Sequence, residues 1–73
     1  MSLVDIQVVK GVFDANQKAE IIERVTDTMV TLQGEAMRGL TWVRIHEIED
    51  GEWGIGGKLL HGSDVRLLVE GGL

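Results

Sequence analysis

Arg44, His46 and Trp53 are the residues of this sequence whose types and spacing best suit chemistry. Arg44 and His46 stand two positions apart in LTWVRIHEI, residues 40–48, a run whose alternation predicts a strand with both side chains on one face. An arginine there is either one partner of an interface ion pair or a grip for an anion, because a guanidinium binds carboxylates bidentately. For His46 we favour an interface residue over a base or a metal ligand.

Trp53 lies in the glycine-rich stretch GEWGIGG, residues 51–57, which Lys58 follows. A P-loop needs serine or threonine after this lysine, where the chain has Leu59. A dinucleotide-binding fingerprint would follow the first strand of a βαβ unit, whereas this stretch follows the second. A hairpin is therefore favoured, because glycine permits positive φ, and Trp53 alone indicates no more than a core or interface residue.

The elements that must position these residues alternate between strand and helix. The run LVDIQVV, residues 3–9, has the alternation of a first strand, and residues 40–48 give the second. Between them, Asp14 and Gln17 have the spacing of a capping box, and Gly34 is a natural terminator for a helix of roughly 19 residues. This order predicts two parallel strands with a right-handed crossover, hence an α+β, β-α-β subunit with a glycine-rich hairpin towards its C-terminus.

The predicted helix has one apolar stripe, which would cover one face of the two-stranded sheet. The stripe comprises Ile22, Val25, Met29 and Leu32, with Ile21 beside it. The other face, with Trp42, Arg44 and His46, would remain open. Two strands with an open face are not independently stable. We therefore expect this face to pack on another copy of the chain.

Composition narrows the possible functions. The 73 residues predict a single domain, 1–73, and the absence of cysteine removes disulfides and thiol chemistry. The net charge of −5 argues against nucleic acid as a partner. No long apolar run or secretory signal is present, so we expect no membrane partner and a cytoplasmic location. The apolar tail after Lys58 is expected to dock on a neighbouring subunit or on its own.

The N-terminal strand, the capped helix GVFDANQKAEIIERVTDTMV, the strand WVRIHEI and the closing WGIGG together resemble the 4-oxalocrotonate tautomerase family of the tautomerase superfamily. The resemblance runs from about Leu3 to Lys58, and VR followed by WGIGG is its most specific pair. It implies small βαβ subunits that assemble as a homohexamer, a trimer of dimers, without metal or cofactor. It also implies keto–enol tautomerisation, by a 1,3- or 1,5-proton shift, of a small carboxylate-bearing enol or dienol.

The resemblance assigns roles to three positions. The family's catalytic base is the amine of an N-terminal proline, and Ser2 stands at that position here. Arg44 matches the strand arginine that binds the substrate carboxylate or stabilises an enolate. Trp53 matches the hairpin aromatic that excludes water and helps keep the amine neutral, in a site shared between subunits. With Ser2 and Met1 in place we expect little proline-type activity. Two explanations for the serine are open: an N-terminus altered for expression, or a natural loss of the base.

Two further hypotheses remain open at the level of sequence. The family's best-known members carry a second arginine after the glycine that Gly11 matches, and its absence here favours a monocarboxylate or a more apolar enol. A haloacrylate-type hydrolytic dehalogenase or hydratase would need a carboxylate to activate water, and the nearby polar candidates are Asp5, Gln7 and Glu47. The other alternative is a non-catalytic oligomeric scaffold or binding module that has lost the base.

Overall fold

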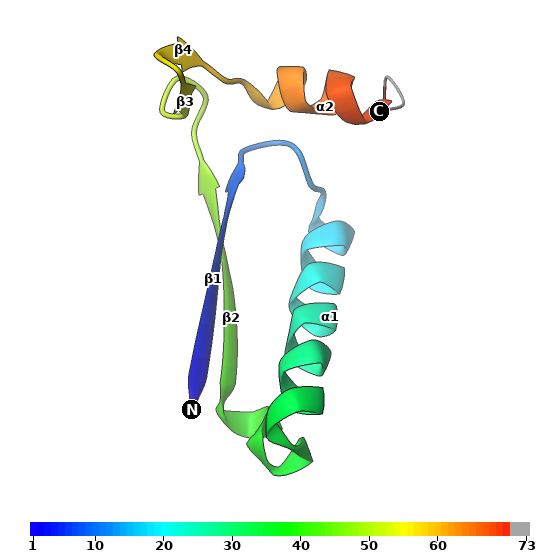
Figure 1. The fold of residues 1–73 in the computed structure, drawn as a ribbon. Coiled ribbons are helices and arrows are strands. Elements are labelled where there is room, and N and C mark those ends of the chain that lie inside the picture. Colours follow the sequence, from blue (N-terminus) through cyan, green and yellow to red (C-terminus); the bar gives the residue numbers. More distant parts are fainter. Residues whose placement is uncertain (71–73) are drawn as a thin grey trace.

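The computed structural model describes residues 1–70 and has an α+β fold (Figure 1). Strand β1 (Ser2–Val9), helix α1 (Ala15–Gln33) and strand β2 (Thr41–Ile48) form a βαβ unit, and a short 3-10 helix, η1 (Glu35–Leu40), leads into β2. The hairpin strands β3 (Gly54–Ile55) and β4 (Lys58–Leu59) and a second helix, α2 (Gly62–Glu70), follow.

Strands β1 and β2 pair in parallel, as predicted, from Ser2 opposite Thr41 to Val9 opposite Ile48. Side chains alternate along both strands between a half-buried face and an exposed face. Helix α1 runs alongside the half-buried face (Figure 1), and the other face is open except at its end, where Val9 is 5% exposed and lies near Gly62 of α2. The sheet therefore positions its exposed side chains on an open face, as the alternation of the sequence predicted.

Local signals in the sequence set both ends of α1. The Gln17 N–H donates to Asp14 Oδ1 at 2.8 Å, and the Asp14 N–H donates to Gln17 Oε1 at 3.0 Å, which completes the predicted capping box. At the other end, Gly34 has φ 102° and donates its N–H to the Val30 carbonyl oxygen. Positive φ of this kind is cheap only for glycine, so the predicted helix end is confirmed.

The predicted apolar stripe of α1 is wrong at two positions. Leu32 is 80% exposed and Ile22 is 39% exposed, whereas Val30, outside the predicted stripe, is 5% exposed. The last turn of the helix is oriented by Gln33, whose side chain bonds to both Ser2 and Thr41. Adjacent residues of a helix lie about 100° apart around its axis, so Leu32 points outwards when Gln33 points at the sheet.

The predicted hairpin is confirmed, and the tail adds a helix that the sequence pattern did not predict. Gly56 and Gly57 both have positive φ in the turn between β3 and β4, as a two-residue type I′ hairpin turn requires. Helix α2 docks on its own chain through two hydrogen bonds. The Gly62 N–H donates to Asp50 Oδ1 at 3.1 Å, and Arg66 Nη1 donates to the Gly11 carbonyl oxygen at 2.6 Å.

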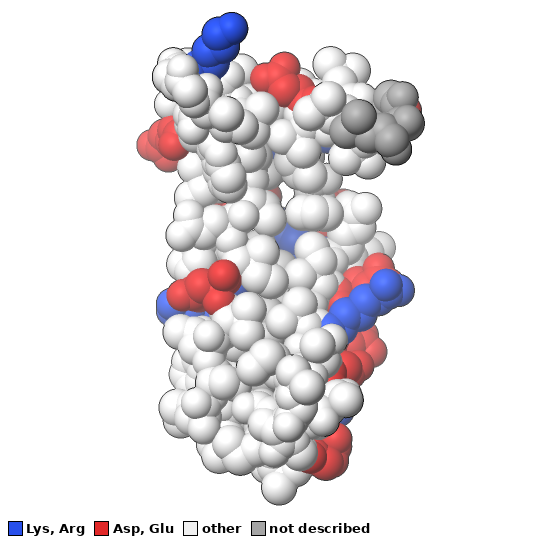
Figure 2. Space-filling view, in the orientation of Figure 1, with Lys and Arg blue, Asp and Glu red and all other residues white. Residues whose placement is uncertain are grey.

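The buried core is very small. Among residues 1–70 only Val9 and Val30 are buried apolar residues, each 5% exposed. Large exposed apolar side chains are more numerous: Met1, Leu3, Ile22, Leu32, Leu40, Trp42, Ile55, Leu59, Leu67, Leu68 and Val69. Figure 2 shows Lys and Arg occurring singly among Asp and Glu on the face in view, without a basic stripe. None of the described helices combines the length and the apolar character needed to cross a bilayer.

Candidate active site

Ser2 begins β1, and its hydroxyl is held on the side of the sheet that faces α1. Ser2 Oγ donates to Gln33 Oε1 at 3.2 Å, and Gln33 Nε2 donates to Thr41 Oγ1 at 2.5 Å. Thr41 Oγ1 in turn donates to the Met37 carbonyl oxygen at 2.8 Å. This chain of bonds joins the start of β1 to the end of α1. The hydroxyl is therefore a structural donor, and its partner among residues 1–70 is an amide oxygen rather than a base.

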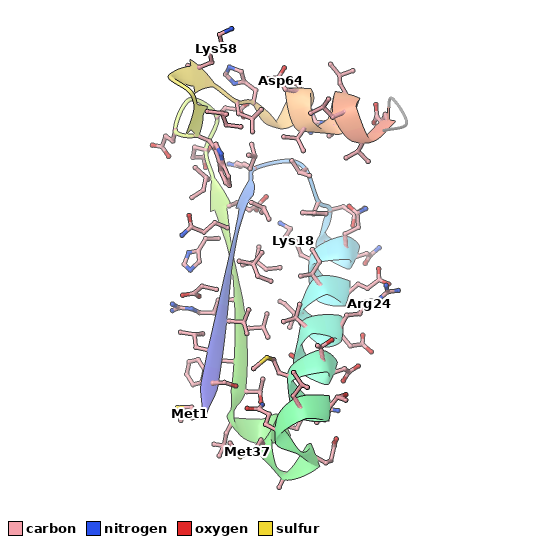
Figure 3. The ribbon with its side chains drawn as sticks, viewed as in Figure 1. Met1, Lys18, Arg24, Met37, Lys58 and Asp64 are labelled. Atoms are coloured by element: carbon pink, nitrogen blue, oxygen red, sulfur yellow. The ribbon has the colours of Figure 1, made fainter. Side chains whose placement is uncertain are left out.

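An apolar hollow of about 380 Å³ surrounds the start of β1 and is lined by Met1, Ser2, Leu3 and Trp42. Leu3 and Trp42 lie opposite each other in the parallel register. Met1 lies at the end of the sheet where β1 begins (Figure 3). Met1, Leu3 and Trp42 are each more than half exposed in one chain, so the hollow is apolar but open to solvent.

Arg44 lies on the open face two residues beyond Trp42 and is held by Asp5, its partner across the two strands. Arg44 Nε donates to Asp5 Oδ1 at 2.9 Å, and Arg44 Nη2 donates to Asp5 Oδ2 at 3.1 Å. The hydrogen bond lowers the pKa of the Asp5 carboxyl below its ordinary value and raises the pKa of the guanidinium. Of the two roles predicted for Arg44, this structure contains the ion pair, formed within one chain.

His46 continues the same row of side chains on the open face. Its Nε2 lies 3.7 Å from Asp5 Oδ1, so a protonated His46 would add a second positive charge beside Asp5. Gln7 lies opposite His46 in the register. Within residues 1–70, no group of three or more histidine, aspartate or glutamate side chains could hold a metal ion.

Trp53 lies far from Ser2 within one chain. Ser2 pairs with Thr41 at one end of the sheet, and Trp53 follows Ile48 at the other end (Figure 1). At about 3.3 Å per residue, the strands separate these ends by more than 20 Å. The half-buried Trp53 instead closes the hairpin, because its carbonyl oxygen accepts the Leu60 N–H at 2.8 Å.

Trp42 is the aromatic side chain that one subunit places beside position 2, and sequence reasoning did not assign it to the site. Two signals were available. The alternation of β2 puts Trp42 on the same face as Arg44, and the parallel register puts it opposite Leu3. Neither signal distinguishes a site wall from an interface residue until the hollow around Ser2 is known.

Glu47, another candidate from the sequence, is held in an ion pair beneath the β1–α1 loop. Its Oε1 lies 2.8 Å from Lys18 Nζ, and the Gly11 N–H donates to its Oε2 at 3.4 Å. These hydrogen bonds, that of Lys18 foremost, lower the pKa of Glu47. Lys18 points from α1 towards the sheet, whereas Arg24 points away from it (Figure 3). Asp5 and Glu47 are thus both engaged by cations, and a carboxylate with a lowered pKa is a weak base.

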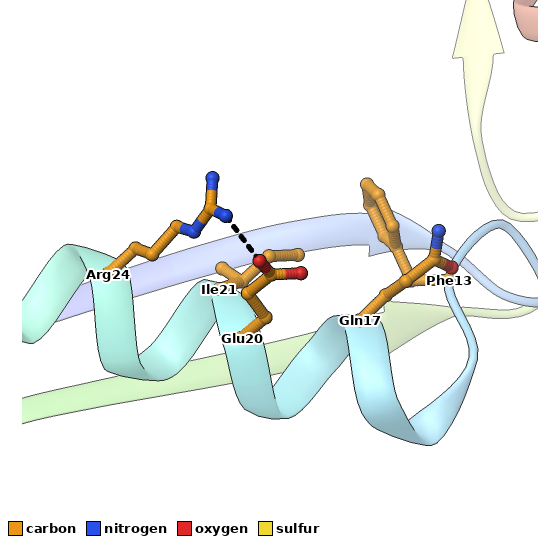
Figure 4. Close-up of a pocket in the computed structure, with 5 residues that line it drawn as sticks. All are labelled: Phe13, Gln17, Glu20, Ile21 and Arg24. Carbon is orange, nitrogen blue, oxygen red and sulfur yellow. Dashed lines mark ion pairs between the residues drawn. The ribbon is translucent and has the colours of Figure 1, made fainter.

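Another hollow, of about 200 Å³, lies along the first turns of α1. It is lined by Phe13, Gln17, Glu20, Ile21 and Arg24 (Figure 4). The one basic side chain there, Arg24, forms an ion pair with Glu20. An anion entering this hollow would therefore meet the Glu20 carboxylate beside the guanidinium of Arg24.

Comparison with known protein families gives a match for this chain. A protein-family model named Tautomerase, described as Tautomerase enzyme, matches residues 3–62. The matched range includes Trp42, Arg44 and Trp53 and begins directly after Ser2. No curated protein matches the chain.

Proposed function

The chain belongs to the Tautomerase family, and we propose that it is a tautomerase-type isomerase for a carboxylate-bearing enol or dienol. The observation that carries this proposal is the apolar hollow at position 2, with Arg44 two residues beyond Trp42 on the same open face. A neutral amine in such a hollow and a guanidinium beside it are the two groups that a cofactor-free proton shift needs.

In the proposed reaction, an N-terminal amine at position 2 acts as the base. The amine takes the proton from the enol hydroxyl, and negative charge develops on the enolate. Arg44 binds the substrate carboxylate or stabilises that charge, and the ammonium returns the proton at carbon. No atom or electron is gained or lost, so the reaction needs no co-reactant. A proline at position 2 supplies a secondary amine for this step, whereas the hydroxyl of Ser2 donates to Gln33.

Trp53 enters this site only from a second subunit, because one chain places it at the far end of the sheet. The small core and the open sheet face support assembly into a homo-oligomer, and the family resemblance favours a hexamer. Within that assembly Trp53 would exclude water from the reacting atoms.

Two alternatives have unequal support. The bonded hydroxyl of Ser2 and the large exposed apolar surface favour the non-catalytic scaffold as the second candidate. The haloacrylate-type dehalogenase or hydratase has less support, because Asp5 is held by Arg44 and Glu47 by Lys18. Neither carboxylate is free to activate water.

The experiment is to substitute Ser2→Pro in a protein from which Met1 is removed, and to follow phenylpyruvate ketonisation. We expect activity to appear. In that background Arg44→Ala should lower kcat/KM by about 100-fold, the usual effect of losing one donor to developing negative charge. Arg24→Ala, which removes a guanidinium from the outer side of α1, should leave the rate unchanged. Continued inactivity of correctly processed Ser2→Pro would favour the scaffold.

A further inference from the structure

We propose that Asp5 is a specificity-determining residue that restricts the Arg44 site to ligands with a single carboxylate. The proposal rests on the proposed function, because it assumes that Arg44 meets the substrate. It goes further by assigning a role to Asp5 and by stating which anionic charge the site accepts.

The geometry of the pair limits how a ligand can approach Arg44. A guanidinium has five N–H donors, and Asp5 occupies the edge formed by Nε and Nη2. The remaining edge, between Nη1 and Nη2, has no partner among the hydrogen bonds of residues 1–70. A ligand carboxylate therefore binds Arg44 end-on, with the Asp5 carboxylate fixed on the adjacent edge.

Charge then discriminates between ligands. The Asp5–Arg44 pair is neutral as a unit, so a first carboxylate gains a directional bond without a net positive field. Along β1 and β2 the other basic side chain is His46, which also lies beside Asp5. A second ligand carboxylate therefore meets the negative charge of Asp5 with no further arginine or lysine on either strand.

Fumarate and crotonate test this directly, because they share a four-carbon trans-alkene and differ by one carboxylate in place of a methyl group. Binding of each is measured by calorimetry at pH 7 in wild-type protein and in Asp5→Asn. The asparagine oxygen can still accept one bond from Arg44, so the substitution removes charge and keeps part of the orientation. We expect fumarate to gain about tenfold in affinity relative to crotonate in Asp5→Asn.

Two matched variants separate this effect from general changes. Asp5→Ser also removes the charge and serves if Asp5→Asn fails to fold, as judged by circular dichroism. Glu23→Gln removes one negative charge from α1 and should leave the fumarate-to-crotonate ratio unchanged. A ratio that is the same in wild type and both Asp5 variants would overturn the proposal. The proposal would also be overturned if Glu23→Gln changed the fumarate-to-crotonate ratio as much as the Asp5 variants do, or if neither ligand bound.

The outcome is independent of the amine base, since fumarate and crotonate are bound here without turnover. If only the proposed function is wrong, processed Ser2→Pro will be inactive, while the ratio of fumarate affinity to crotonate affinity will still depend on Asp5. If only the proposal for Asp5 is wrong, processed Ser2→Pro will be active, while the substitutions of Asp5 will leave the fumarate-to-crotonate affinity ratio unchanged. A measurement on wild-type protein adds a check: crotonate affinity should vary little with ionic strength, because the pair that binds it is neutral.

Discussion

The backbone of Gly62 lies against the carbonyl oxygen of Lys10, so closely that a Cβ on Gly62 would overlap it. Gly62 is buried and begins α2, and Lys10 begins the loop that joins β1 to α1. One turn further along α2, Arg66 bonds to the Gly11 carbonyl oxygen. Two contacts thus join α2 to the loop between β1 and α1.

Gly62→Ala should weaken this attachment. The added methyl group must displace either α2 or the loop at Lys10, so we expect a lower Tm and faster amide hydrogen exchange in α2. Gly39→Ala is the matched control, because nothing lies within 4 Å of a Cβ there and the backbone has no positive φ. Equal Tm values for the two variants would show that Gly62 does not anchor the helix.

Glu47→Gln should change how stability depends on pH. The folded pKa of Glu47 is depressed by Lys18 and Gly11, so its stabilisation is complete above the unfolded value of about 4.3. It is lost as the pH falls through the folded pKa. We expect the variant to melt below wild type at pH 7 and the difference to vanish once the pH has fallen below the folded pKa of Glu47. Thermal melts across this range, with Glu23→Gln as the control, measure it; a difference that persists in acid contradicts the assignment.

Trp42→Glu should disrupt assembly through the open face of the sheet. The side chain is 56% exposed in one chain, and a carboxylate there cannot be buried against another copy without a large desolvation cost. Sedimentation velocity should show a smaller species than wild type. Thr28→Glu adds the same charge at an exposed position of α1, and this variant should sediment as wild type does. A wild-type protein that is itself a stable monomer would contradict packing through this face.

Much of the fold could be predicted because its signals are local. Asp14 and Gln17 fix one end of α1 within four residues of chain, and Gly34 fixes the other. The turn at Gly56 and Gly57 is equally local. Helix α2 escaped prediction because its position depends on distant contacts, such as that between Arg66 and Gly11, which no sequence period reports.

The candidate site was only partly predictable for a related reason. Alternation placed Arg44 on the open face, but the choice between ion pair and anion grip depended on what lies opposite it. That partner, Asp5, is set by the register of two strands separated by a helix. The separation of Trp53 from Ser2 also follows from the parallel direction of the strands. The roles of Ser2, Arg44 and Trp53 in catalysis remain predictions.

The most direct measurement compares kcat/KM for phenylpyruvate ketonisation in two forms of Ser2→Pro that differ only in whether Met1 is retained. Removing Met1 exposes the proline amine beside Leu3 and Trp42, whereas retaining it converts the same nitrogen into an amide. We predict activity in the processed form and a rate at least 100-fold lower in the unprocessed form, since an amide nitrogen is not a base. Equal rates in the two forms, or no activity in either, would contradict a tautomerase whose base is the amine at position 2.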